Sequence, residues 1–406
     1  MLAPDRLPLP SLETMPVLDV DPYDPMVVQD PYLLTRDLPH GTQFARANVS
    51  TDYYGNLAAL PVVVAVGHEA VQRGQREVGT FGTHDGPGLR PDPERQTGSW
   101  PMYDDGDNHG RLLNPLQEAM RPRNLGLLQA RAVRRFAELL HTVGTEQFDA
   151  APHLGRIVAM GVSDMLGVDP DQGFDPEAVI HLSHVATAAQ GPTSRYDHRI
   201  GPALAGLAPI YQTILEGRAA EDSAGADISR AVSAGALTLD EAANLIGTIP
   251  VAGIRTQQGT LGFLLQGLAQ GNQARVLMTN PRLDVRAGRE ALRDGSSLRY
   301  IVRAGPEAFG GRRVLLAQHA GNHDPVFWQD PSNFDVERNN LKHVALGSGL
   351  HRCLGNYWAE STVQAFIQAL REHRVTGVSI EGDPIIDPSD AAVVAHSQLP
   401  VRLTRR

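Results

Sequence analysis

The chain has 406 residues, a formal net charge of −10, and 42% hydrophobic against 20% charged residues. This composition is typical of a soluble globular protein, large enough to enclose a cofactor, and it excludes wholesale disorder and fibrous repeats. The acidic balance argues against nucleic acid as a partner, and the lack of a long apolar run or a signal peptide argues against a membrane. We therefore expect a cytoplasmic protein.

Residues 1–15 are rich in proline and predict an extended lead. Two short runs of β-branched and aliphatic residues, 60–66 and 314–316, predict buried strands. Helical periodicity predicts helices over 125–143, 154–166, 202–216, 239–270 and 357–372. No repeat or low-complexity linker divides the chain. We therefore expect one domain over 1–406, mainly α with small β-sheet regions.

Two segments interrupt these patterns and predict loops. Residues 79–101 are crowded with glycine and proline, and residues 190–198 separate two helical patterns. Long loops in compact proteins are often functional, so both are candidate walls or lids of a pocket.

The longest predicted helix, 239–270, starts at a capping box made by Thr238 and Glu241. Its continuous face carries the small residues Ala252 and Gly253, and then Thr256. Pro250 removes a backbone donor and predicts a kink nearby. Small residues beside a kink leave room for a ligand.

Cys353 is the only cysteine, which excludes an intramolecular disulfide and a multi-cysteine metal cluster. It lies among Gly347, Gly349 and Gly355, immediately before a predicted helix. Glycines permit positive φ and close backbone approach, and a helix N-terminus favours thiolate over thiol. The pattern predicts a metal ligand or a nucleophile.

This loop resembles the cysteine loop of the cytochromes P450, Phe-x-x-Gly-x-x-x-Cys-x-Gly. Leu346 stands at the phenylalanine position, while Gly349, His351, Cys353 and Gly355 fit the pattern. The resemblance extends over roughly residues 16–403. It implies the P450 fold, with Cys353 as the axial thiolate of haem b and this loop, including Gly347, beneath the haem.

Two further sequence motifs carry the resemblance. Glu290 and Arg293 match the family's Glu-x-x-Arg pair, and Arg338 matches the arginine that completes a structural triad. The family also implies that His109, Arg303 and either His343 or His351 pair with the haem propionates.

The long helix is similar to the family's distal helix, where Ala252, Gly253 and Thr256 fit but Arg255 replaces the usual acid. The resemblance implies that Thr256 helps to deliver protons during oxygen activation. Arginine cannot cycle a proton near neutral pH, so proton delivery must be rerouted. We expect Arg255 to lean into a salt bridge or a water channel, since adjacent helix residues point about 100° apart.

The resemblance implies a haem-thiolate monooxygenase that hydroxylates or O-dealkylates a small organic, possibly aromatic, substrate with O2. Its electrons would come from NAD(P)H through a ferredoxin reductase and a ferredoxin. The ferredoxin would dock on a basic surface. The candidate arginines for this surface are Arg111, Arg121, Arg123, Arg131, Arg134, Arg135 and Arg352.

Because of Arg255, several alternatives stay open. The chain could use hydrogen peroxide directly, or it could be an oxidase of unusual outcome, such as coupling or nitrogen oxidation. It could also be a non-catalytic P450-like auxiliary protein. Arg90, Arg95 or Arg255 could hold a substrate carboxylate.

Overall fold

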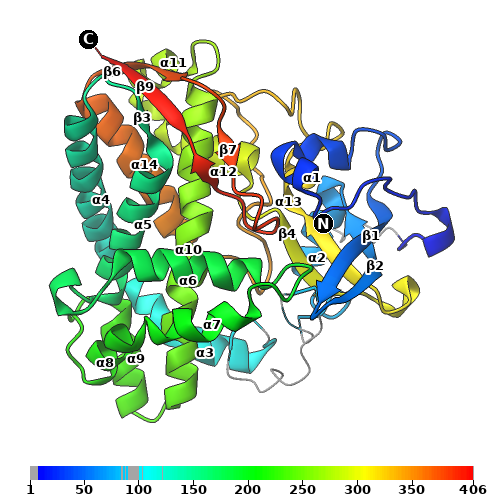
Figure 1. Ribbon diagram of the computed structural model, residues 1–406, viewed down its shortest axis with the longest axis horizontal. Coiled ribbons are helices and arrows are strands. Elements are labelled where there is room, and N and C mark those ends of the chain that lie inside the picture. Colours follow the sequence, from blue (N-terminus) through cyan, green and yellow to red (C-terminus); the bar gives the residue numbers. More distant parts are fainter. Residues whose placement is uncertain are drawn as a thin grey trace, which may run out of the picture.

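The computed structural model describes residues 8–83, 86, 88–89, 100–102, 104–120 and 122–405. Helices form most of the molecule, and a smaller region built on a four-stranded sheet lies beside them (Figure 1). The mainly α class with small sheets is confirmed. Within the described residues, no helix is both long enough and apolar enough to span a membrane.

Both predicted strands lie in the four-stranded sheet. Its order is β1 (Phe44–Tyr53), β2 (Asn56–Ala65), β5 (Arg313–Ala317) and β4 (Tyr300–Ala304). The predicted segments pair with each other in parallel, with Val63 opposite Val314. Residues 62–66 and 314–316 are buried, as expected of β-branched and aliphatic runs covered on both faces, while Leu60 and Pro61 are more exposed. The β1–β2 hairpin turns at Tyr54 and Gly55, both at positive φ, as a two-residue turn requires.

The centre of the helical region is α10 (Leu239–Leu268), which begins at the predicted capping box and contains Pro250. It packs on α5 (Ala150–Leu166), α6 (Pro176–Ala188) and α12 (Asp284–Gly295). A second pair, α4 (Pro122–Val143) with α14 (Asn356–Glu372), closes the far side of this region (Figure 1). One continuous apolar core joins these helices.

Most predicted helices are confirmed within a few residues, but the prediction of one helix over 202–216 is wrong. Two helices occupy this stretch, α7 (Asp197–Ala205) and α8 (Ala208–Leu215), and the first ends at Gly206. The apolar periodicity continues across the break, because both helices pack on the same core.

Several shorter elements were not predicted, since short segments carry weak periodicity. The helices are α1 (Pro25–Gln29), α2 (His68–Arg76), α3 (Asp107–Ala119), α9 (Ala224–Ser233), α11 (Gln273–Thr279) and α13 (Gln318–Asn322). The strands are β3 (Phe148–Asp149), β6 (Val375–Ile380), β7 (Ile385–Ile386), β8 (His396–Gln398) and β9 (Pro400–Arg405).

Candidate active site

The loop that carries Cys353 is a closed turn held by its own backbone. The Cys353 amide donates to the Leu346 carbonyl at 2.9 Å. Gly347 and Gly349 have φ of +67° and +77°, where a side chain would be strained. A Cβ on Gly349 would also lie 3.0 Å from the Cα of Arg76 in α2. The glycines therefore fix the shape of this loop and its close approach to α2.

The Cys353 side chain is exposed, yet burial raises the pKa of its thiol. The two observations agree if the sulfur borders space inside the molecule and not the outer surface. The Gly355 amide and Arg352 act in the opposite direction on this pKa but do not overcome desolvation. This corrects the expectation that the helix N-terminus by itself favours the thiolate. A bound cation would be needed to deprotonate the sulfur.

Three of the predicted cofactor-binding residues come together near Asp105. The His351 ring lies 4.6 Å from the His109 ring, and its Nε2 lies 2.7 Å from the Asp105 carboxylate. Arg303, on β4, lies close enough for its charge to lower the pKa of His351. The Asp105 carboxylate in turn acts to raise the pKa of Arg303. The cluster joins α3, β4 and the cysteine loop at one place.

Arg303 is a buried cation without a close counterion among the described residues. It is 7% exposed, and no described carboxylate lies within 4 Å of its guanidinium. NH1 donates to the Val302 carbonyl, while Nε has no partner among the described residues. Desolvation lowers the pKa of Arg303 to about 10, so it stays charged at neutral pH. A buried unpaired charge is costly, and an anionic group placed beside it would relieve that cost.

His343 lies in a different environment. Burial lowers its pKa to about 3, and the charges that act on it include Arg289 and Arg293, on α12. Of the two alternatives, His351 is the one that joins the Arg303 cluster.

On α10, Ala252 is exposed and Thr256 is half-exposed although the helix runs through the core. The Thr256 hydroxyl donates to the Ala252 carbonyl at 2.7 Å. Gly253 faces elsewhere, because a Cβ there would lie 2.8 Å from the ring of Trp358 on α14. This packing corrects the expectation that Gly253 leaves room for a ligand. Ala252 and Thr256 border the open space, and Gly253 lets two helices approach.

Arg255 is buried and turned sideways, as expected. Its NH1 lies 3.3 Å from the Asp387 carboxylate and its Nε lies 3.5 Å from that of Asp390. Two carboxylates already neutralise this guanidinium, so the hypothesis that Arg255 holds a substrate carboxylate is wrong. Arg90 and Arg95, the other candidates for that role, lie outside the described residues.

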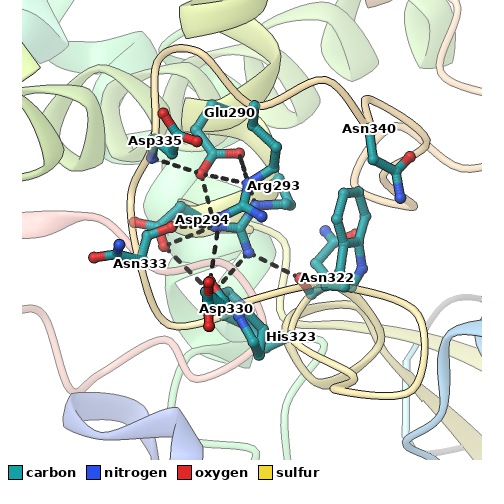
Figure 2. A network of polar contacts seen from close by, with 12 residues as sticks. Glu290, Arg293, Asp294, Asn322, His323, Asp330, Asn333, Asp335 and Asn340 are labelled. Atoms are coloured by element: carbon teal, nitrogen blue, oxygen red, sulfur yellow. Dashed lines mark hydrogen bonds and ion pairs between the residues drawn. The ribbon is translucent and has the colours of Figure 1, made fainter.

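The predicted triad exists as a buried cluster, and Figure 2 shows its members Glu290 and Arg293 within a network of polar contacts. Arg293 donates to both carboxylate oxygens of Glu290 at 2.8 Å, and Arg338 Nε lies 3.0–3.1 Å from the same two oxygens. The remaining guanidinium nitrogens donate to backbone carbonyls of 322, 329–331 and 333. Asn322 extends the cluster, because its Oδ1 accepts from the Val344 amide at 2.8 Å. The start of the cysteine loop is thereby tied to α12.

The predicted basic surface is partly neutralised. Arg131 and Arg135 both pair with Asp164, and Arg111 pairs with Glu241 at 2.5 Å. The prediction counted acids only along the local sequence, and these acids come from other helices. Arg134 and Arg352 are exposed, and Arg121 lies outside the described residues.

Sequence reasoning missed Asp105, Ser183 and Trp358. Asp105 lies 246 positions from its partner His351, and Ser183 contacts α10 from α6, 68 positions from Val251. Only a fold-level alignment of α14 on α10 could have indicated Trp358.

Comparisons with known proteins place this geometry in context. No family model matches the chain. It is 29% identical over 189 residues to cytochrome P450 CYP199A2 of Rhodopseudomonas palustris, covering 44% of this chain and 45% of that protein. It is 28% identical to cytochrome P450 105C1 of a Streptomyces species, covering 61% and 68%. It is 24% identical to linalool 8-monooxygenase of Pseudomonas putida, covering 64% and 68%. The chain thus spans about half of the first relative and about two thirds of the other two.

Solved structures share the fold over nearly the whole chain. The acyl-carrier-protein complex of P450BioI matches with a TM-score of 0.79 at 19% identity, covering 93% of this chain and 100% of that one. CalO2 matches with a TM-score of 0.77 at 23% identity, covering 95% and 99%. Curated relatives named as P450s and monooxygenases thus agree with the shared fold and with the cysteine loop. Together, the relatives and the solved structures support a cytochrome P450, an oxidoreductase similar to the monooxygenases among those relatives.

Proposed function

We propose that the chain is a haem-thiolate monooxygenase that hydroxylates or O-dealkylates a small organic molecule with O2. The observation that carries this proposal is the Cys353 sulfur, exposed to space although desolvation raises the pKa of its thiol. A metal ion at that sulfur would bind the thiolate and remove the penalty of ionising it.

The residues present fit haem b. Cys353 would be the iron ligand, and the positive-φ glycines let its loop lie close beneath a flat group. No carboxylate of the part of the chain that the structure describes pairs with Arg303, and a propionate would supply the anion that a buried cation needs. His109 and His351 stand beside it as further hydrogen-bonding partners. When bound, the haem supplies the oxidising chemistry, and thiolate donation favours O–O cleavage.

Thr256 would hold and pass a proton on the distal side. Its hydroxyl now donates to the Ala252 carbonyl, and a rotation about its side chain would turn the O–H toward the open space. Because Arg255 is a fixed cation held by two aspartates, the proton would reach Thr256 through solvent and not through residue 255.

The O2-dependent route is favoured over direct use of peroxide. An arginine that anchors a carboxylate substrate for peroxide chemistry must be free to meet that carboxylate, and Arg255 is engaged by Asp387 and Asp390. A non-catalytic auxiliary role is disfavoured, since the cysteine ligand and its loop are intact.

An aromatic side chain beside the exposed face of α10 supports a small apolar or aromatic substrate. Trp100 donates from Nε1 to the Thr248 hydroxyl at 2.5 Å. Thr248 lies one turn before Ala252 and two turns before Thr256, so the indole adds an aromatic wall along the same helix face. Electrons would come from NAD(P)H through a ferredoxin reductase and a ferredoxin that docks near the exposed Arg352 and Arg134.

The test is the carbon monoxide difference spectrum of the reduced protein. We expect a Soret band at the position typical of thiolate ligation, and we expect Cys353→Ser to abolish it. Leu350→Ser changes an exposed residue of the same loop and serves as the matched control, which should keep the band. A protein that takes up no haem, or a spectrum that Cys353→Ser leaves unchanged, would overturn the proposal. Spin-state titration with small aromatics then identifies the substrate class.

A further inference from the structure

A buried polar cluster joins α6, α10 and the segment 387–393, and we call it the α6–α10 clamp. Its members are Ser183, His184, Thr187, Arg255, Asp387, Ser389 and Asp390. Arg255 lies at its centre and is 6% exposed. Besides its two aspartate partners, Arg255 donates from Nε and NH2 to the Val393 carbonyl at 3.4 Å. One side chain of α10 thus holds three points of the segment 387–393.

Ser183 links α6 to the backbone of the same turn of α10. Its hydroxyl donates to the Val251 carbonyl at 3.1 Å and accepts from the Arg255 amide at 3.4 Å. This turn carries Ala252 and leads to Thr256. The position of α6 is therefore coupled to the geometry of the distal helix where it borders the open space.

Two further residues of α6 bind the segment 387–393 directly. The Thr187 hydroxyl donates to the Asp390 carboxylate at 2.5 Å. His184 Nε2 lies 2.7 Å from the Ser389 hydroxyl and 3.4 Å from the Asp387 carboxylate. All three elements of the clamp are thus connected pairwise, and Figure 1 shows α6 crossing α10.

The segment that the clamp holds continues into a wall of the distal region. The Val394 amide donates to the Ser297 carbonyl at 2.7 Å, just before β4. A Cβ on Gly259 of α10 would lie 2.3 Å from the Val394 carbonyl, so the segment and the helix are in direct contact. Movement of residues 387–393 would therefore change the space beside α10.

We propose that the α6–α10 clamp controls opening of the distal pocket, with Arg255 as a positioning residue that replaces a proton-relay residue. The proposal rests on the haem-thiolate function proposed above. Without the guanidinium, Asp387 and Asp390 would lose the cation that they share, so the two carboxylates would repel each other or one would take up a proton, and either outcome would loosen the segment from α10. Every group that Arg255 holds would then be released together.

The experiment uses ferric haem-loaded protein and imidazole as the probe ligand. Stopped-flow absorbance gives the association and dissociation rates, and hydrogen exchange gives the local protection of 176–188 and 385–396. The variants are Arg255→Met, which removes the charge, Arg255→Lys, which keeps it, and Ser183→Ala. Arg156→Met is the matched control, because it removes an exposed ion pair of α6 with Glu177 outside the clamp.

We expect Arg255→Met to raise both imidazole rates at least fivefold and to increase exchange in both segments, with partial rescue in Arg255→Lys. Ser183→Ala should act in the same direction with about half the effect on a logarithmic scale, and Arg156→Met should match the wild type. Rates and exchange within twofold of the wild type in Arg255→Met would overturn the proposal. Exchange that rises evenly over the whole chain would also overturn it, because it would show only a general loss of stability.

If Arg255→Met loses haem, hydrogen exchange in Ser183→Ala and in a further variant, Asp387→Asn, tests the proposal instead. Both variants weaken the clamp but keep Arg255. Failure of the proposed function is a separate result. A wild-type protein without haem would refute the monooxygenase, while the exchange difference between Arg255→Met and Arg156→Met would still decide whether the clamp exists.

Discussion

Two buried arginine–carboxylate clusters, one centred on Glu290 and one on Arg255, differ in charge balance and in geometry. The first cluster has two arginines around Glu290, at 2.8–3.1 Å, and Asp294 lies 3.4 Å from one of them. The α6–α10 clamp has one arginine for two aspartates, at 3.3 and 3.5 Å. Spare donors of the first cluster bind backbone carbonyls of several segments, whereas the spare acceptors of the second bind hydroxyls, an imidazole and backbone amides within the segment 387–393.

The difference indicates which side is rigid and which side moves. Arg293 and Arg338, which bind Glu290, also donate to backbone carbonyls of several chain segments (Figure 2). This cluster therefore breaks only when the surrounding chain unfolds. Contacts between side chains of separate elements can open while each element stays intact. A rigid Glu290 cluster next to the cysteine loop would hold the cofactor in place. An α6–α10 clamp that can open would admit a substrate beside α10.

The largest expected effect is that of Glu290→Ala. Two buried guanidiniums lose their only shared carboxylate, and breaking such a pair costs about 3–5 kcal/mol. We expect little or no haem-loaded protein, measured as soluble yield and haem content. Glu360→Ala removes a partly exposed partner of Arg289 and serves as the control, with a loss below about 1 kcal/mol. A stable holoprotein without the Glu290 carboxylate would remove the contrast between the two clusters.

Replacing arginine by lysine sharpens the contrast. Arg338→Lys loses the planar fork on Glu290 and donors to three backbone carbonyls, which we expect to cost about 2–3 kcal/mol. Arg255→Lys keeps the charge and loses only long contacts, which we expect to cost about 1 kcal/mol. The urea midpoint of each holoprotein measures the difference. Equal losses, or a larger loss for Arg255→Lys, would contradict the assignment of the clamp as the looser cluster.

The sequence predicted the first cluster because Glu290 and Arg293 are three residues apart on a helix, which brings them together without tertiary information. It also predicted that Arg255 turns sideways, since the helical repeat determines this. It could not predict Asp387 and Asp390, because pairing with a segment up to 138 positions away depends on how β8 returns to α10. Likewise, the small size of Gly253 could not show whether it leaves room for a ligand or lets a neighbouring helix approach. The close contact with Trp358 shows that it lets a helix approach.

The clamp should also respond to acid in a defined direction. Desolvation favours the neutral form of Asp387, but the Ser389 hydroxyl and Arg255 outweigh it and lower its pKa from 3.8. A carboxylate with a lowered folded pKa contributes stability above its unfolded value, and this is lost as the pH falls through the folded value. Exchange at 385–396, expressed relative to the intrinsic exchange rate at each pH, should therefore stay constant down to about pH 4 and rise below it. In Arg255→Met the rise should begin at a higher pH, and an unshifted profile would contradict the pairing.

The smallest effect is expected from Asp390→Asn, because two contributions oppose each other. Burial raises the pKa of Asp390, so ionising it above pH 3.8 destabilises the folded state, and asparagine removes that penalty. The amide oxygen can still accept from the Ala392 and Val393 amides, but Arg255 loses one of its two carboxylates. We expect a change below about 1 kcal/mol in the urea midpoint at neutral pH. The relative stability of the variant should be highest at neutral pH and fall as the pH drops toward 3.8, where the wild type is relieved of the same penalty. A loss of stability near that of Glu290→Ala would show that both clusters are equally necessary for the fold. It would contradict the proposal that the α6–α10 clamp opens while the fold stays intact.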